Sequence, residues 1–136
     1  MKYLGIDLGD VRTGIAVSDE TGFLATGIGF IKETYRPYLA DKIAELMKKH
    51  GCGAIVLGDP VNMNGSRGEK SQKAHEFAAL LKEKYGFDVI LYDERCTTMQ
   101  AHKILSECDV RGKNRKIAVD SLSASIILQD FLDSKR

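Results

Sequence analysis

The sequence has few of the features that mark secreted, membrane-spanning or zinc-binding proteins. Its three cysteines, Cys52, Cys96 and Cys108, are far apart, and none belongs to a C-x-x-C pair. An odd number of distant cysteines, without histidines at zinc-binding spacing, predicts free thiols rather than disulfides or a zinc site. No apolar run approaches the ~18 to 20 residues that span a bilayer, and residues 1–7 lack the basic and apolar segments of a signal peptide. We therefore expect a cytoplasmic protein without a membrane segment.

The chain also has almost no net charge, but its cations are unevenly distributed. The formal net charge is +1, and four cations lie within six residues of one another: Arg111, Lys113, Arg115 and Lys116. The rest of the chain is therefore mildly acidic. A local cationic patch on an acidic body is suited to holding a polyanion such as nucleic acid at one edge. We predict nucleic-acid contacts at these four residues, with a solvated loop as the alternative.

Length and composition predict one globular domain. The 136 residues are close to the ~150 of an average domain, so residues 1–136 are expected to form a single domain without an interdomain cleft. The fractions of hydrophobic residues (43%) and charged residues (29%) are those of an ordinary globular protein. No internal repeat or low-complexity tract is present.

The first quarter of the chain predicts three antiparallel strands. Residues 2–7 and 13–19 are short apolar stretches, and the turn between them contains Gly9, which supplies the backbone freedom that a tight turn requires. Residues 23–31 form a weaker third strand, because two glycines interrupt its faces.

Helices and strands alternate in the remainder of the chain. We predict, in order, a helix over 36–50, a buried strand over 53–58, a helix with apolar positions from 74 to 85, a strand over 89–92, a third helix that begins near Thr97, and a final helix after the basic run. Right-handed crossovers place the last two strands parallel to the first. The predicted fold class is therefore α/β, with a mixed five-stranded sheet that has its first three strands antiparallel and is flanked by helices.

Three of the predicted strands end in carboxylates. Asp7 follows the first strand, Asp59 the fourth, and Asp93 and Glu94 the fifth. These carboxyl ends point the same way, and ligands of such sheets bind in crevices at that edge. The alternative for Asp7 is that its side chain bonds its own turn.

Asp120 interrupts an otherwise apolar helix face. Ala124, Ile127 and Phe131 follow it at +4, +7 and +11, so a carboxylate continues the stripe that should face the sheet. One explanation is that Asp120 lies in the first helical turn, where the helix dipole favours an acid. The other is that it binds a metal.

A metal site follows if Asp7, Glu94 and Asp120 converge. Each pair of carboxylates within ~4 Å repels by about 4 kcal/mol at an effective dielectric constant near 20, so a cation must neutralise them. Oxygen ligands without histidine or cysteine favour Mg²⁺ or Mn²⁺ over zinc. Two such ions can activate a water molecule and stabilise the leaving oxygen in phosphodiester cleavage. This chemistry predicts hydrolysis of nucleic acid.

Four ordered motifs resemble one family over nearly the whole chain. They are Asp7-x-Gly9-x-x-Arg12-x-Gly14-x-Ala16-x-Ser18-Asp19, Gly58-x-Pro60 with Asn64-Gly65-Ser66, Asp93-Glu94-Arg95-x-Thr97-Thr98, and Asp120 before Ala124 with Ile127-Leu128-Gln129. The chain resembles the YqgF (RuvX) family, which implies the ribonuclease H-like fold of the Holliday-junction resolvase superfamily. The resemblance further implies a metal-dependent nuclease whose acids and metal ligands are Asp7, Glu94 and Asp120. Asp59 is the reserve, since related folds often place the second acid after the fourth strand.

The resemblance implies two substrates. One is the 5′ end of pre-16S ribosomal RNA, and the alternative is a four-way DNA junction. Junction resolution needs two symmetric cuts and hence normally a homodimer, whereas a monomer can trim RNA. A third hypothesis is that the protein is a ribosomal-RNA-binding factor with little catalytic power. The Asp7-x-Gly9 pattern also resembles a phosphate motif of sugar kinases, but the chain offers neither a second domain nor an adenosine motif.

Three further arginines lie near the predicted acidic edge. Arg12 and Arg95 are suited to hold phosphate oxygens, and surface ion pairs are the alternative for them. Arg67 lies in a polar loop with Asn64 and Ser66 that is suited to contacts with the nucleic-acid backbone, and plain turn chemistry is the alternative for this loop.

Overall fold

The structure, a computed structural model, describes residues 1–60, 68–93 and 112–135, and in the last helix it describes side chains from residue 122 onward. Five strands form one sheet in the order β3-β2-β1-β4-β5. Their bounds are β1 Tyr3–Asp7, β2 Arg12–Ser18, β3 Ala25–Lys32, β4 Ala54–Asp59 and β5 Val89–Asp93. The described helices are α1 Arg36–His50, α2 Glu69–Tyr85 and α4 Gly112–Ser134.

The strand pairing confirms the predicted topology. β1 pairs with β2, and β2 with β3, in antiparallel fashion, while β4 lies parallel to β1 and β5 parallel to β4. The helix expected to begin near Thr97 lies outside the described residues. Within the part of the chain that the structure describes, no helix combines the length and apolarity of a membrane span.

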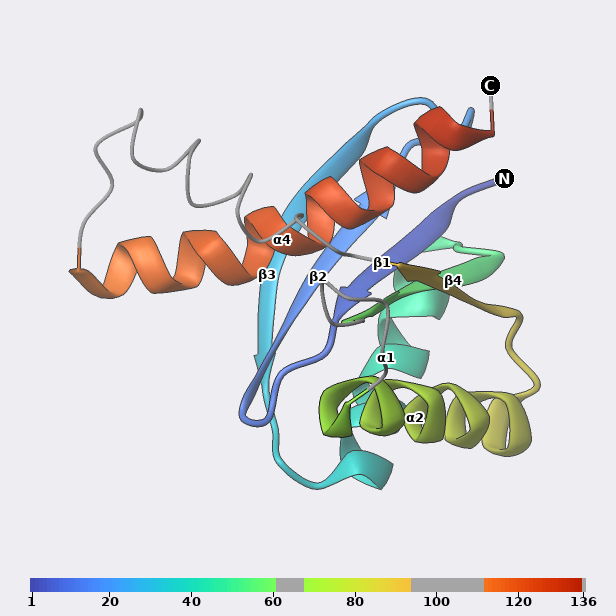
Figure 1. Cartoon of the computed structure of the whole chain (residues 1–136). Coiled ribbons are helices and arrows are strands. Elements are labelled where there is room, and N and C mark those ends of the chain that lie inside the picture. Colours follow the sequence, from blue (N-terminus) through green and yellow to red (C-terminus); the bar gives the residue numbers. More distant parts are fainter. Residues whose placement is uncertain (61–67, 94–111, 136) are drawn as a thin grey trace.

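Helices cover both faces of the sheet, as Figure 1 shows. Side chains alternate along each strand, so Leu4 and Ile6 pack with α1 and α2 on one face, while Tyr3 packs with α4 on the other. In β4, Ile55 shares the first core and Val56 the second. This alternation assigns every residue of the central strands to one of two faces, which we call the α2 face and the α4 face.

Gly5 allows α4 to lie directly on β1. A Cβ atom at this position would come within 2.8 Å of Leu128 Cβ and 3.2 Å of the Ala124 carbonyl oxygen. Only a residue without a side chain permits this approach. The contact fixes the height of α4 along β1, and therefore the position of the helix relative to the end of the strand.

The termini of α1 follow ordinary capping chemistry. Pro37 lies in the first turn, and Gly51 ends the helix in the left-handed conformation with φ of 66°. The predicted helix over 36–50 is confirmed. Helix α2 begins at Glu69, before the first apolar position predicted for it, because Ser71 rather than a hydrophobic residue faces the sheet in its first turn.

The third strand begins two residues later than predicted. The Asp19 carboxylate accepts hydrogen bonds from the backbone nitrogens of Phe23 (2.7 Å) and Leu24 (3.3 Å), which holds these residues in a turn. Further along, Ile28 is an extra residue in β3, because Ile15 pairs with Gly29 and Ala16 with Gly27.

The prediction that the basic run precedes the last helix is wrong for three of its four residues. Helix α4 begins at Gly112, so Lys113, Arg115 and Lys116 belong to its first turns. Lysine and arginine are good helix formers, and no proline interrupts residues 112–120. Asp120 consequently lies in the third turn, at 3.6 residues per turn, rather than in the first.

Candidate active site

Three carboxylates end strands at one edge of the sheet. Asp7 ends β1, Asp59 ends β4 and Asp93 ends β5. Because Ile6 pairs with Leu57, Asp7 lies level with the residue before Asp59 on the neighbouring strand. The strands that carry these acids are parallel, so their ends share the carboxyl edge, where ligands bind in α/β sheets.

Asp7 and Asp59 nevertheless belong to opposite faces. Asp7 alternates with Tyr3 and Gly5, which lie against α4, so it is on the α4 face. Asp59 alternates with Ile55 and Leu57 and is on the α2 face. Asp7 and Asp59 therefore lie at the same edge of the sheet but on the sides covered by different helices, α4 for Asp7 and α2 for Asp59.

Asp59 is buried and hydrogen-bonded to α2. Only 2% of its surface is exposed. Ser71 Oγ donates to Oδ1 at 2.5 Å, and His75 Nε2 lies 3.0 Å from Oδ2. One helical turn separates Ser71 from His75, which brings both side chains to the same carboxylate.

The backbone of α4 places Asp120 at the height of Asp7. The helix runs antiparallel to β1, since the Phe131 ring packs on Tyr3 with centroids 5.3 Å apart and Ala124 lies at Gly5. From Ala124, one turn back along the helix covers about 6 Å and reaches position 120. From Gly5, two residues along the strand cover about 6.6 Å and reach Asp7.

Arg12 lies on the same face as Asp7. It precedes Gly14 by two residues in β2, and Gly14 pairs with Asp7. Its guanidinium lies 5.6 Å from the centroid of the Phe30 ring. The Arg12 Nε is buried, and among the described residues it has no hydrogen-bond partner. A buried donor without an acceptor costs about 1–3 kcal/mol, so an anionic ligand here would satisfy it.

The turn after Asp7 is closely packed. A Cβ atom on Gly9 would lie 2.0 Å from the Arg12 carbonyl oxygen, so glycine is required by close approach rather than by the φ freedom that the sequence suggested. The Gly9 nitrogen donates to Thr13 Oγ1 at 3.5 Å, and Arg36 Nη1 donates to the Gly9 carbonyl at 3.0 Å. These contacts hold the backbone that follows Asp7.

Several predicted site residues fall outside what the structure describes. Glu94, Arg67, Arg95 and Arg111 lie outside the described residues. For four others the helix backbone is described without the side chain: Lys113, Arg115, Lys116 and Asp120. Glu94 directly follows Asp93, the last residue of β5.

The donor chemistry at this edge fits a hard divalent cation. Among the side chains that the structure describes, no three histidine, cysteine or acidic groups lie close enough to hold a metal ion. The candidate set of Asp7, Glu94 and Asp120 contains only carboxylate oxygens, which suit Mg²⁺ or Mn²⁺. With position 120 in the third turn of α4, the helix dipole no longer explains an acid at this position.

Comparison with known proteins identifies the family. The family model described as "RuvX: Holliday junction resolvase" matches residues 1–134. The chain belongs to the RuvX family. A relative from Bacillus thuringiensis (strain Al Hakam) is 42% identical over 137 residues, which covers 99% of this chain and 100% of that protein. Its name describes it as a candidate nuclease for pre-16S rRNA, as does the name of an equally similar relative from Bacillus cereus (strain AH820).

Solved structures confirm the predicted ribonuclease H-like fold. Thermus thermophilus RuvC in complex with a Holliday junction substrate is 14% identical, with a TM-score of 0.59 over 99% of this chain and 95% of that one. The fowlpox virus resolvase, in complex with Holliday junction DNA, is 16% identical, with a TM-score of 0.58 over 99% of both chains.

Proposed function

We propose that this RuvX-family protein is a metal-dependent nuclease that hydrolyses phosphodiester bonds in pre-16S rRNA, at the 5′ end of the mature RNA. The observation that carries the proposal is the position of Asp7 at the carboxyl edge on the α4 face, level with the turn of α4 that contains Asp120. The 42% identical relatives named for pre-16S rRNA support the choice of substrate. A ribosomal RNA precursor would also place the protein in the cytoplasm.

Asp7, Glu94 and Asp120 would hold the cations. When bound, one or two Mg²⁺ or Mn²⁺ ions lower the pKa of a coordinated water and stabilise charge on the leaving oxygen. The contribution of the chain itself is to fix the carboxylates. β1 is paired on both sides, and the contacts at Gly9 hold the backbone that follows Asp7.

The cations of the chain would hold the nucleic acid. Arg12 is suited to donate its Nε hydrogen bond to a phosphate oxygen on the face of Asp7, where a charge-assisted bond would satisfy a buried donor. Six other residues are proposed as phosphate contacts further from the reacting bond than Arg12: Arg67, Arg95, Arg111, Lys113, Arg115 and Lys116.

Glu94 is a better second acid than Asp59. Each carboxylate oxygen of Asp59 already has a partner on α2, one from Ser71 and one from His75. Asp59 also lies on the α2 face of the sheet, whereas Asp7 lies on the α4 face. The all-carboxylate site is therefore proposed with Glu94, and Asp59 is proposed as a residue that holds α2 to the sheet.

A second candidate function is resolution of four-way DNA junctions. The description of the matching family model favours it. This function would call for a homodimer, because two strands must be cut symmetrically. A binding factor for ribosomal RNA without catalysis is the remaining alternative from a different class.

Cleavage of a substrate panel tests the proposal. The panel is labelled pre-16S rRNA, a four-way DNA junction and plain duplex, each incubated with Mg²⁺ or Mn²⁺ and with the wild type or Asp7→Asn. We expect metal-dependent cleavage of the rRNA precursor that chelator and Asp7→Asn both abolish. Preferential cleavage of the four-way junction would favour junction resolution over rRNA processing. Binding of the RNA without cleavage of any substrate would favour the non-catalytic rRNA-binding factor.

A further inference from the structure

A hollow lies beside the turn that follows Asp7, on the α2 face. It has a volume of about 570 Å³ and is lined by Asp10, Thr34, Arg36, Lys73, Glu76, Phe77 and Leu80. Phe77 is 2% exposed and Leu80 is partly buried, so the inner wall is apolar and the charged groups surround it. We call it the α1–α2 hollow, because it lies between the start of α1 and the side of α2. Its volume is in the range of pockets that bind a small organic group.

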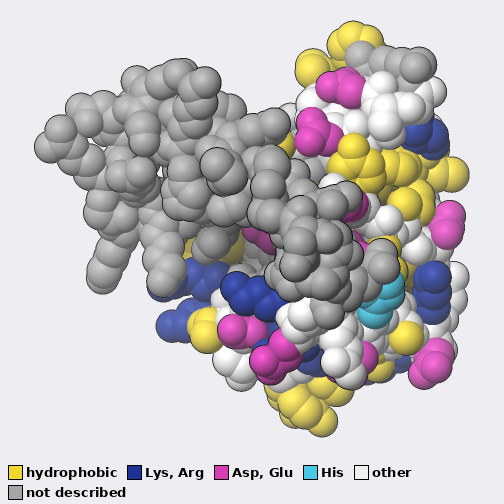
Figure 2. Space-filling view, in the orientation of Figure 1, with side chains coloured by type: hydrophobic (Ala, Val, Ile, Leu, Met, Phe, Trp, Pro, Cys, Tyr) yellow, Lys and Arg dark blue, Asp and Glu magenta, His cyan; other side chains and the backbone are white. Residues whose placement is uncertain are grey.

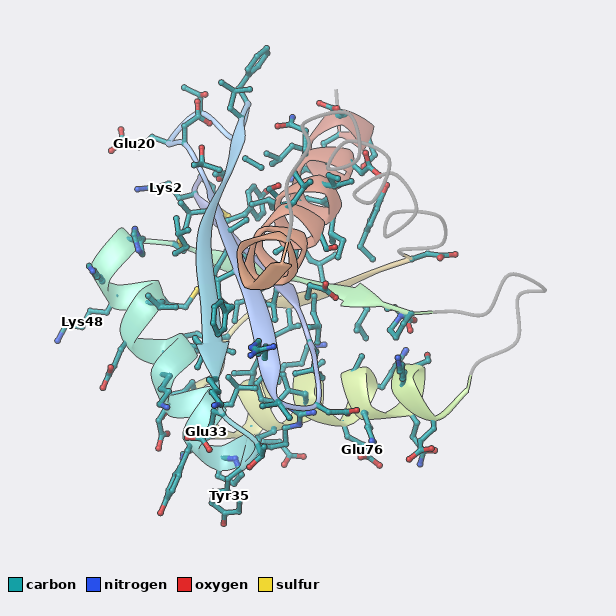
Figure 3. All side chains as sticks on the ribbon, turned by 90° about the vertical axis from the view of Figure 1, so that its left-hand side faces the viewer. Lys2, Glu20, Glu33, Tyr35, Lys48 and Glu76 are labelled. Atoms are coloured by element: carbon teal, nitrogen blue, oxygen red, sulfur yellow. The ribbon has the colours of Figure 1, made fainter. Side chains whose placement is uncertain are left out.

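One exposed tyrosine, Tyr35, lies at the rim of this hollow and packs against a second, Tyr38. Thr34 and Arg36 line it, so Tyr35 between them is at its edge. The Tyr35 and Tyr38 rings pack edge to face with centroids 4.7 Å apart, yet they are 55% and 59% exposed. Figure 3 shows Tyr35 and Glu76 on the same lower side of the molecule, with Tyr35 projecting from the start of α1. Exposed aromatic rings beside cations are the usual platform for stacking unpaired bases.

The hollow is continuous with the backbone that follows Asp7. A smaller cavity is lined by Leu8, Gly9 and Asp10 together with Arg36, Lys70 and Lys73, and it shares three residues with the α1–α2 hollow. Three residues span at most about 10 Å, so this path begins within that distance of Asp7. A strand whose phosphate is at Asp7 on the α4 face could therefore pass the turn at the end of β1 and continue into the hollow on the α2 face.

The charges of the hollow favour a single nucleotide over a duplex backbone. Figure 2 shows basic and acidic side chains side by side on the lower part of this view. Lys73 Nζ lies 3.5 Å from both Asp10 Oδ1 and Glu69 Oε1, and such exposed pairs are weak enough to be exchanged for a phosphate. Asp10 and Glu76 would repel a row of phosphates, but they can accept hydrogen bonds from the amino groups of a base.

We propose that the α1–α2 hollow binds an unpaired nucleotide of the RNA substrate next to the bond that is cut. The base stacks on Tyr35 or Tyr38 and enters the space over Phe77, while Arg36 and Lys73 contact the adjoining phosphate. This inference rests on the proposed nuclease function and deepens it, because it makes a single-stranded RNA segment part of the recognised substrate. A fully paired duplex cannot supply a base to this site.

Binding of RNA in chelator, where no cleavage occurs, tests the inference. The probes are a fluorescently labelled single-stranded RNA and the same strand annealed to its complement, measured by anisotropy. We expect the double variant Tyr35→Ala/Tyr38→Ala to weaken single-strand binding at least about fivefold, which corresponds to the loss of one stacked base. Duplex binding should be unchanged. Tyr35→Phe/Tyr38→Phe should retain single-strand affinity, since the ring and not the hydroxyl stacks.

Phe23→Ala provides the matched control. Phe23 is 54% exposed, and it lines a different cavity together with Met1, Tyr3 and Leu132, at the opposite end of β1. The inference is overturned if the wild type does not bind the single strand, if the tyrosine variant binds it as tightly as the wild type, or if Phe23→Ala or the duplex shows the same loss. Metal-dependent cleavage that is lost in Asp7→Asn would keep the nuclease function even if the hollow fails this test.

Discussion

Asp59 illustrates how the surroundings of a carboxylate decide its role. It ends a central strand beside Asp7, which made it a candidate ligand from the sequence. In the structure it is buried against α2, where Ser71 and His75 bond its two oxygens. The pleat of the strand assigns it to the face away from α4. The sequence contained the signal for this role, because Ser71 and His75 are one turn apart on the helix that follows, but only the register of α2 on the sheet shows that they meet Asp59.

Asp59→Asn should destabilise the fold. The amide keeps an acceptor for Ser71, but an NH₂ group replaces the carboxylate oxygen that contacts His75, so the buried carboxylate contact with His75 is lost. We expect the free energy of unfolding to fall by about 1–3 kcal/mol in urea denaturation. The exposed Asp10→Asn serves as the control and should change it by less than about 0.5 kcal/mol. Equal stabilities of Asp59→Asn and the wild type would contradict the assignment of Asp59 to α2.

Asp19 should make stability depend on pH. The backbone N–H of Phe23 and then the hydroxyl of Thr21 hold the pKa of the Asp19 carboxyl below its usual value. A lowered pKa means that the carboxylate stabilises the folded state above the pKa of the unfolded chain, about 3.9, and that this contribution is lost as the pH falls through the folded value.

The variant Asp19→Asn should therefore melt at a lower temperature than the wild type at pH 7. The difference between the two melting temperatures should shrink as the pH is lowered below about 4. Melting curves from pH 7 to pH 3 measure it, with the neighbouring Glu20→Gln as the control. A difference that stays constant with pH would show that the Asp19 charge does not hold the turn.

Helix α4 connects the fold to the site. Its height along β1 is set where Ala124 and Leu128 lie against Gly5, and the same register brings position 120 to the height of Asp7. Periodicity in the last helix predicted that Ala124, Ile127 and Phe131 face the sheet, as they do. It could not give the start of the helix, since the charged residues from 113 to 116 carry no apolar period that would distinguish a helix from a loop.

Gly5→Ala tests this contact. The new methyl group would lie 2.8 Å from Leu128 Cβ and 3.2 Å from a helix carbonyl, neither of which can move without shifting α4. We expect a loss of about 1–3 kcal/mol in the free energy of unfolding, together with slower cleavage. Gly53→Ala is the matched control, because the three atoms nearest to its methyl group would all belong to the exposed side chain of Met1, the first of them 3.1 Å away. Equal losses in both variants would contradict a special role for Gly5.

The topology of the molecule was largely predictable from its sequence. The apolar strands and the helical crossovers between them predict the strand order from the sequence pattern alone. Gly51 and Gly86 mark the ends of α1 and α2. The surface proposed to bind an unpaired nucleotide was less predictable. The Tyr35 and Tyr38 pair belongs to no motif, and only the packing of α1 beside α2 forms a hollow next to it. Residues that bind substrate through a surface leave weaker sequence patterns than residues that build a core.

The most direct test of the whole account is the single-turnover cleavage rate, with saturating Mg²⁺, of four variants beside the wild type. We expect Asp7→Asn, Glu94→Gln and Asp120→Asn each to slow cleavage at least about a hundredfold, which is the scale of losing a metal ligand. Asp59→Asn, measured at a temperature where circular dichroism shows it folded, should cleave at close to the wild-type rate. Undiminished cleavage by Asp7→Asn, or a loss in Asp59→Asn as large as that in Glu94→Gln, would contradict the proposed site.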